Sequence, residues 1–182
     1  MDTFLSPLGD YGPVAEFCGV KDPTRADFRR SVDVAAGRMR SKVGPVLMET
    51  LTHSTPGGAA IVTPFRVRVV VSSVGVDVAD LTTDPHHLDP SHGGQVVRRT
   101  SGQLFPACTI TYASGWEYYQ WPPELEGAGF ELARHLWRTQ LGNQRVTPAG
   151  GDQPDVPGAG WLWPRQALQL IDGWELTPLG FA

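Results

Sequence analysis

Residues 116–145, with the sequence WEYYQWPPELEGAGFELARHLWRTQLGNQR, decide the fold that we expect for this chain. The stretch begins with an aromatic cluster and continues into Pro122 and Pro123. These prolines lack the N–H groups that a first helical turn leaves unpaired. Gly142 and Asn143 are typical of a helix C-terminus. The stretch therefore predicts a helix over residues 123–141.

Apolar residues of this predicted helix fall into two stripes. The first stripe consists of Leu125, Ala128, Leu132 and Leu136, and the second of Phe130, Ala133, Trp137 and Leu141. Together they cover an arc too wide for a helix with only one buried face. We expect the helix to pack on two sides, with its own core and a neighbouring subunit as the candidate partners. The predicted inter-subunit surface consists of Phe130, Arg134, Trp137, Arg138 and Leu141.

Length and composition limit the function classes. A chain of 182 residues fits one domain, or one domain with an inserted module. Its 21 glycines and 16 prolines argue against a pure helical bundle, and its net charge of −4 argues against a basic field for nucleic acid. No apolar run predicts a membrane span, and the N-terminal residues do not resemble a secretory signal. Cys18 and Cys108 lack a motif spacing, which favours buried free thiols.

Two further helices are expected before residue 46. Residues 10–19 are compatible with a short helix, and Thr24 with Asp27 resembles a capping box that opens a helix over residues 24–43. One face of the longer helix is apolar, with Phe28, Val32, Ala35, Met39 and Val43. Another face is basic, with Arg25, Arg29, Arg30, Arg38 and Arg40. The basic face is a solvated surface, a contact for an acidic protein partner, or a DNA contact.

The hydrophobic period changes to that of strands over residues 46–115. Strands are expected at residues 46–53, 74–78, 96–99 and 108–113. In addition, Phe65, Val67, Val69 and Val71 alternate with Arg66 and Arg68, as in one half-buried strand. Residues 146–160 are rich in Pro and Gly and predict an extended linker, and a short helix is expected at residues 165–171. The predicted fold class is therefore α+β: a small helical bundle with an inserted antiparallel β module and an extended C-terminal tail.

No catalytic constellation is visible, and we expect neither an enzyme nor a cofactor. Nucleophile-elbow, Walker A and dinucleotide-binding patterns are missing from the sequence. The strongest metal-like pattern is a loop that contains Asp84, His86, His87, Asp89 and His92. The adjacent histidines cannot share one face of a strand, so an ordinary solvated loop is the favoured interpretation. A metal-dependent hydrolase that uses this loop is the alternative.

Acidic residues gather in the β module. Asp77, Asp80, Asp84 and Asp89 come without an evident compensating base in the sequence. An acidic loop, represented by Asp84 and Asp89, and a basic helix on separate elements suit a head-to-tail contact between identical subunits. The alternative is that both patches face water.

The C-terminal residues are rich in aromatic side chains, including Trp161, Trp163, Trp174 and Phe181. One interpretation is a tail that packs back on its own core. The other is a segment that docks on a partner, because Trp is enriched at interface hot spots. The predicted docking residues are Trp174, Leu176, Leu179 and Phe181.

Residues 108–145 also carry a family resemblance. A strand that ends at residues 111–115, an aromatic link with proline, and a helix reading ELARHLWRTQ resemble the small head–tail adaptor proteins of tailed bacteriophages, also called connector or head completion proteins. The short and long N-terminal helices agree with this resemblance. It implies a structural virion protein of the head–tail interface, made in the bacterial host cytoplasm. Residues 1–145 would form the adaptor domain, and residues 146–182 the linker and docking tail.

The resemblance also implies a homo-oligomeric ring, usually of about twelve copies. Such a ring binds the portal protein on one side and a stopper or tail protein on the other, and the C-terminal tail is the expected portal anchor. DNA would pass through the lumen without sequence-specific contact, and acidic residues such as Asp84 and Asp89 are candidates for a lumen that repels phosphate. Three alternatives remain: a β-dominated stopper or tail-terminator ring protein, the metal-dependent hydrolase, and a small binding module without a ring.

Overall fold

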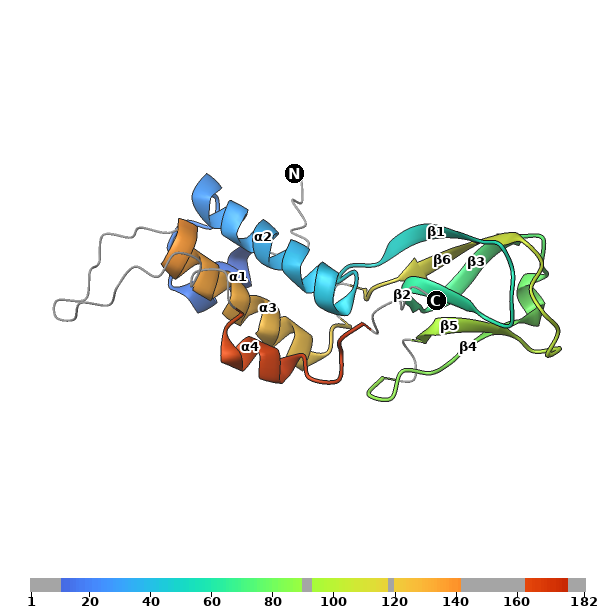
Figure 1. Ribbon diagram of the computed structural model, residues 1–182. Coiled ribbons are helices and arrows are strands. Elements are labelled where there is room, and N and C mark those ends of the chain that lie inside the picture. The colour runs from blue at the N-terminus through green and yellow to red at the C-terminus, as the bar shows by residue number, and fades with distance from the viewer. Residues whose placement is uncertain (1–10, 90–92, 118–119, 142–162, 177–182) are drawn as a thin grey trace. The chain divides into compact units, whose positions relative to one another are not determined.

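The computed structural model describes residues 11–89, 93–117, 120–141 and 163–176. These residues contain two three-stranded antiparallel sheets and the α-helices α1 (Tyr11–Cys18), α2 (Ala26–Val43), α3 (Pro123–Leu136) and α4 (Arg165–Leu170) (Figure 1). The expected α+β class is confirmed. None of the helices in these ranges combines the length and the apolar character that crossing a membrane requires.

The chain divides into two compact units. A helical unit contains the described residues up to Met39 and those between Trp121 and Asp172. A β unit contains the described residues between Arg40 and Gln120, together with residues 173–176. The end of the described chain is thus part of the β unit, whereas α4, directly before it, belongs to the helical unit.

Helix α2 buries the apolar face that its sequence predicts. Phe28, Val32, Ala35 and Met39 are all fully buried. Their spacing places them on one side of the helix, which is why burial of one removes the others from water as well. The Phe28 ring also meets the Trp137 indole edge-on, with ring centroids 5.5 Å apart.

The start of α2 differs from the prediction. The helix begins at Ala26, and the Thr24 backbone amide and hydroxyl both donate to the Asp22 carboxylate, at 2.9 and 2.6 Å. Asp27 instead forms an ion pair with Arg25 at 2.6 Å. The predicted capping box is therefore wrong, because Thr24 forms a local turn with Asp22 and the helix begins only two residues later, at Ala26.

Helix α3 packs on two sides, and the chain itself supplies both partners. The stripe of Leu125, Ala128, Leu132 and Leu136 is buried. On the other stripe, Phe130 packs against Phe17 of α1, with ring centroids 5.6 Å apart. Residues 137–141 continue the helix as one π turn, where the Thr139 hydroxyl donates to the carbonyl oxygen of His135 at 2.7 Å. The predicted helix at residues 123–141 is therefore present, with a wider last turn.

Each sheet of the β unit contains three strands. One sheet has the order β1-β6-β3 and the other β2-β5-β4. The strands are β1 (Glu49–Thr55), β2 (Ile61–Val67), β3 (Val69–Val74), β4 (Leu81–Thr83), β5 (Gly94–Arg99) and β6 (Cys108–Ser114). Their shared core contains Ile61, Val67, Val97, Phe105, Cys108, Ile110 and Tyr112.

The predicted single strand at residues 65–71 is wrong in one respect that matters for the surface. The chain leaves one sheet after Val67 and enters the other at Val69, so the alternation does not continue across Arg68. Arg66 is buried, whereas Val69 and Val71 are 53% and 57% exposed. Three backbone carbonyls accept hydrogen bonds from the buried guanidinium, so Arg66 points inward although hydrophobicity alone predicts that it faces solvent.

The segment after β3 also differs from the prediction. Residues 74–78 do not form a strand; β3 ends at Val74 and a short 3₁₀ turn (Val78–Asp80) precedes β4. The Asp80 carboxylate accepts hydrogen bonds from Arg99 Nε at 2.6 Å, from the Thr100 hydroxyl at 2.7 Å, and from the backbone and side chain of Ser101. These donors hold the pKa of Asp80 well below its usual range. Asp80 therefore joins the turn to the end of β5.

Substitution of Leu132 tests the packing of α3. Leu132→Ala removes a fully buried side chain and should lower the free energy of unfolding by about 2–5 kcal/mol. Leu168→Ala on α4, where the leucine is 37% exposed, is the matched control and should cost much less. Urea unfolding followed by tryptophan fluorescence measures both. Equal losses in the two variants would contradict this packing.

Candidate functional site

Arg66 lies inside the β unit and binds three backbone segments. Arg66 is only 3% exposed. The guanidinium donates to the carbonyl oxygens of Val43 at 2.9 Å, Trp174 at 2.5 Å and Glu175 at 3.1 Å. Burial lowers the pKa of Arg66 to about 10, which leaves the group charged at neutral pH. The end of α2 and residues 173–176 are therefore fixed to strand β2.

Trp174 packs within the β unit between two aromatic partners. Trp174 is only 5% exposed. The indole stacks on the His86 imidazole, with centroids 4.9 Å apart and planes 15° apart, and meets the Trp116 indole edge-on at 5.8 Å. The Leu176 N–H donates to the Lys42 carbonyl at 2.8 Å. Residues 173–176 are thus an integral part of this unit.

His86 is a buried, neutral histidine. His86 is 8% exposed, and its Nδ1 accepts a hydrogen bond from the Leu88 N–H at 3.3 Å. Burial lowers the pKa of His86 to about 4, and the positive charges of Arg66 and His87 act in the same direction. The uncharged ring suits a stack against the Trp174 indole.

A hollow of about 250 Å³ lies beside this cluster, and its polar lining includes Arg66, Asp84, His86, His87, Gln95 and Glu175. Asp84 forms an ion pair with Arg98 at 3.4 Å, and Glu175 forms one with Lys42. Within the described ranges, no group of three His, Cys, Asp or Glu side chains is placed to hold a metal ion, and His92 lies outside those ranges. Arg66, Asp84 and Glu175 of this lining are engaged in hydrogen bonds or ion pairs within the β unit.

The predicted basic face of α2 makes many contacts within the chain. Arg25 pairs with Asp27 and lies 5.1 Å from the centroid of the Trp137 ring. Arg29 lies 5.1 Å from the Tyr11 ring, whose hydroxyl donates to Asp33.

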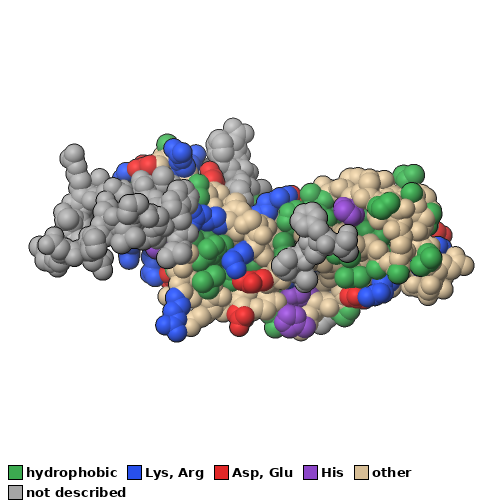
Figure 2. Space-filling view, viewed as in Figure 1, with side chains coloured by type: hydrophobic (Ala, Val, Ile, Leu, Met, Phe, Trp, Pro, Cys, Tyr) green, Lys and Arg blue, Asp and Glu red, His purple; other side chains and the backbone are tan. Residues whose placement is uncertain are grey.

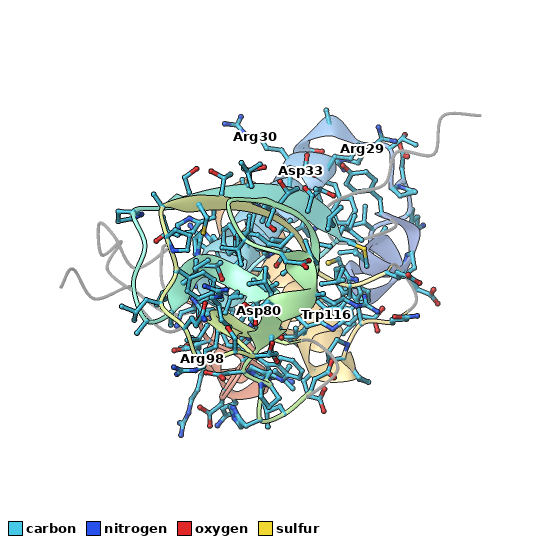
Figure 3. All side chains as sticks on the ribbon, turned by 90° about the vertical axis from the view of Figure 1, so that its right-hand side faces the viewer. Arg29, Arg30, Asp33, Asp80, Arg98 and Trp116 are labelled. Atoms are coloured by element: carbon cyan, nitrogen blue, oxygen red, sulfur yellow. The ribbon has the colours of Figure 1, made fainter. Side chains whose placement is uncertain are left out.

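The remaining arginines of that face differ from one another. Arg40 belongs to the β unit, where it pairs with Glu49 at 2.6 Å and covers the Phe65 ring. Arg38 helps burial to lower the pKa of His135. Arg30 is exposed and points away from the helix in Figure 3. Lys and Arg side chains lie among Asp and Glu on the helical unit in Figure 2, so this surface is mixed in charge.

The predicted inter-subunit residues of α3 also have partners in their own chain. Arg134 forms an ion pair with Glu131 at 2.5 Å and covers the Phe17 ring at 4.8 Å. Trp137 contacts Phe28 and Arg25. Arg138 is exposed, and the side chain of Leu141 lies outside the described part. Phe130, Arg134 and Trp137 therefore have contacts within their own chain, and the inter-subunit surface stays a prediction.

The predicted acidic loop requires a correction. Asp84 is paired with Arg98, and Asp80 with Arg99 at 2.6 Å. Both arginines lie on β5, which pairs with β4 and so brings them beside the aspartates. The expectation that Asp80 and Asp84 lack a compensating base is wrong, because the antiparallel pairing of β4 with β5 brings arginines 14 and 19 positions later beside them. Figure 3 shows Asp80 and Arg98 within the β unit.

The structure describes only two of the four predicted docking residues, Trp174 and Leu176. Trp174 and Leu176 pack into their own β unit, as the interpretation of a tail folded back on its core requires. Leu179 and Phe181 lie outside the described residues. The Arg66 contacts that hold this segment were missed at the sequence level, because an arginine between apolar residues of a strand is typical of a solvent-facing position.

The β unit also exposes apolar side chains, including Val69 and Val71 from the stretch predicted as one half-buried strand. Val74 is 74% exposed, in addition to the exposed Val69 and Val71 of the same strand. Figure 2 shows hydrophobic side chains at several places on the surface of this unit. Exposed apolar groups on one strand are typical of a surface that meets another protein.

No protein-family model and no curated protein matches the chain. Solved structures do match it. A chain in the structure "Neck of empty GTA particle computed with C6 symmetry" is 14% identical, with a TM-score of 0.62 over 100% of this chain and 94% of that chain. A chain in the neck of a native GTA particle, computed with C12 symmetry, is 16% identical, with a TM-score of 0.57 over 93% and 91%.

A chain in the virion of a native gene transfer agent particle is also similar. It is 15% identical, with a TM-score of 0.57 over 93% of this chain and 92% of that chain. Identities at this level show a shared fold. The fold therefore extends over nearly the full length of both partners in each comparison.

The pH dependence of stability tests the environment of His86. Because burial lowers the folded pKa from 6.5 to about 4, the unfolded chain binds the proton more readily between these values. The contribution of the neutral ring is fully present above about pH 6.5 and is lost as the pH falls toward 4. Urea midpoints should therefore fall more steeply between pH 7 and pH 4.5 in the wild type than in His86→Phe, which keeps an aromatic ring. Parallel curves would contradict this environment.

Proposed function

We propose that this chain is a structural subunit of a phage-like neck, and specifically a head–tail adaptor between a portal and a stopper or tail component. The observation that carries the proposal is the likeness in fold to neck chains over nearly the whole length of both chains. The resemblance of residues 108–145 to adaptor proteins supports the adaptor role. The helical unit favours an adaptor over a β-dominated stopper or tail-terminator.

The proposed working form is a ring in the virion, with twelve copies as the favoured number. The C6 and C12 symmetries of the similar neck structures support a ring. In such a ring each copy presents two different surfaces, one to each neighbour, and the contacts close when the rotation divides a circle. The role is mechanical and involves no catalysis.

DNA is proposed to pass through the lumen without sequence-specific contact. The net charge of −4 supports weak attraction for phosphate, since a strong grip on DNA needs a basic surface. The pairing of Asp80 and Asp84 with arginines neutralises much of the proposed acidic loop. A weak overall field, rather than an acidic lining, is therefore the proposed reason that DNA slides.

Contact with the portal is proposed for the residues that follow Leu176. Arg66 and the Trp174 stack fix the chain at residues 174–176, directly before the proposed anchor residues in the sequence. Leu179 and Phe181 are the proposed anchors. Trp174 and Leu176 act by holding the segment in place.

Copy number in purified particles tests the neck assignment. Full-length chain, quantified by mass spectrometry against the portal protein of the same particles, should be present in equal number to the portal or in a simple ratio to it. Images of the vertex should place it between portal and tail. Particles that lack the chain, or that carry it only at the tail tip or on the capsid faces, would contradict the proposal.

The double variant Leu179→Ala/Phe181→Ala tests the portal anchor. Because hot-spot side chains carry most of the energy of an interface, binding to purified portal should weaken about tenfold or more. Leu104→Ala, at a leucine that is 70% exposed in the β unit, is the control and should bind as the wild type does. Co-sedimentation of full-length protein with portal measures both. Unchanged binding of the double variant would place the anchor elsewhere.

A further inference from the structure

We propose that edge strand β3 of one copy pairs with edge strand β1 of the next copy, so that the sheet β1-β6-β3 continues from copy to copy. This inference rests on the proposed function as a ring subunit. It names the surface through which neighbouring copies meet. The partner is therefore a second copy of this chain.

Strand β3 is an unprotected edge. It pairs with β6 on one side, and no described strand pairs with its other side. Its sequence, VVVSSV, contains neither a charge nor a proline, and Val69, Val71 and Val74 are 53%, 57% and 74% exposed. Soluble proteins normally guard such edges with charges, prolines or very short strands. A long apolar edge without these features is suited to pairing with another strand.

The edge strands of the other sheet have features that block pairing with a further strand, and β3 lacks these features. Strand β4 has only three residues and lies between Asp80 and Asp84, both of which are in ion pairs. Strand β2 contains Pro64, which has no N–H to donate. Among the described strands, only the sheet that contains β3 therefore has an edge suited to pairing with a strand of another molecule.

The opposite edge of the same sheet supplies a matching strand. Strand β1 has seven residues and pairs with β6 on one side only. Its exposed side chains, Thr50, Thr52 and Ser54, are uncharged. The Glu49 carboxylate is already bound by Arg40 at 2.6 Å. Neither strand therefore brings an unpaired carboxylate or ammonium into the contact, which would be costly to bury.

Strand direction decides which pair of edges can build a ring. β1 and β3 are both antiparallel to β6, so they run parallel to each other. Pairing β3 with β1 of the next copy is then a parallel, head-to-tail contact that leaves one free edge at each end for further copies. Pairing β3 with β3 would be a twofold contact that stops at a dimer.

A β-bulge adds to the apolar character of this edge. The pairing of β3 with β6 shifts between Val70 and Ser72, so Val71 has no partner residue on β6. The extra residue bends the strand locally. Val71 is exposed at this point, and regular pairing resumes at Ser72. Ser72 is therefore a suitable position for a cross-link.

Cross-linking of full-length protein tests the pairing. Thr52 and Ser72 of one copy both lie opposite Thr111 of β6, so the two thiols are placed on separate copies to prevent a cross-link within one copy. Ser72→Cys protein assembled with Thr52→Cys protein, each with its native Cys18 and Cys108 buried, should give a covalent dimer with a short bis-maleimide. Leu104→Cys mixed with Thr52→Cys is the matched control and should give no dimer. A dimer from Ser72→Cys alone, or no dimer from the mixture, would overturn the β3–β1 contact.

A charge on the edge provides the second measurement. Val74→Lys adds the kind of guard that edge strands normally carry and should lower the yield of rings about tenfold. Leu104→Lys, at an equally exposed residue outside β3, should leave it unchanged. Far-ultraviolet circular dichroism checks that both variants fold. Rings that form normally with Val74→Lys would overturn the inference.

Ring formation by the wild-type chain separates this inference from the proposed function. If the wild type forms rings or occupies the neck but the β3 variants behave as controls, the β3–β1 contact is wrong and the adaptor proposal stands. If the wild type neither forms rings nor occurs in particles, both proposals are wrong.

Discussion

A buried guanidinium must find hydrogen-bond acceptors, and in this chain Arg66 finds them in the backbone. Its three carbonyl partners come from the end of α2 and from residues 174 and 175, more than a hundred positions along the chain. Loss of these contacts would leave both a charge and carbonyl groups unsatisfied in the interior, which proteins rarely tolerate. Arg66 binds the backbone of Trp174, and its charge adds to the burial that keeps His86 neutral.

The crossover that follows Arg66 sets the surface of the β unit. Strand β2 directs Arg66 inward, and the chain crosses to the other sheet at Arg68. Beyond that point Val69, Val71 and Val74 of the edge strand β3 are exposed, whereas Val70 packs against the core. A polar interior position and an apolar edge are therefore two results of one crossover. The first organises a single copy, and the second is the surface that we assign to the contact between copies.

Several elements follow from sequence because their causes are local. The spacing of Phe28, Val32, Ala35 and Met39 is enough to predict the buried face of α2, and the Pro122 and Pro123 pair with the two apolar stripes is enough to predict α3. Strands β5 and β6 also lie close to where alternation predicts them. The capping box failed for a local reason as well, since Thr24 binds Asp22 in a turn that precedes the helix.

The sequence by itself determined the α+β class, the long helices and the lack of a catalytic pattern, because hydrophobic period and motif spacing act over a few residues. Only the tertiary structure decided which partners the candidate site residues have. Phe17 packs against Phe130 of α3, Arg98 pairs with Asp84, and residues 174 and 175 bind Arg66. Each of these contacts joins two different elements, and packing between elements leaves no periodic signal in the sequence.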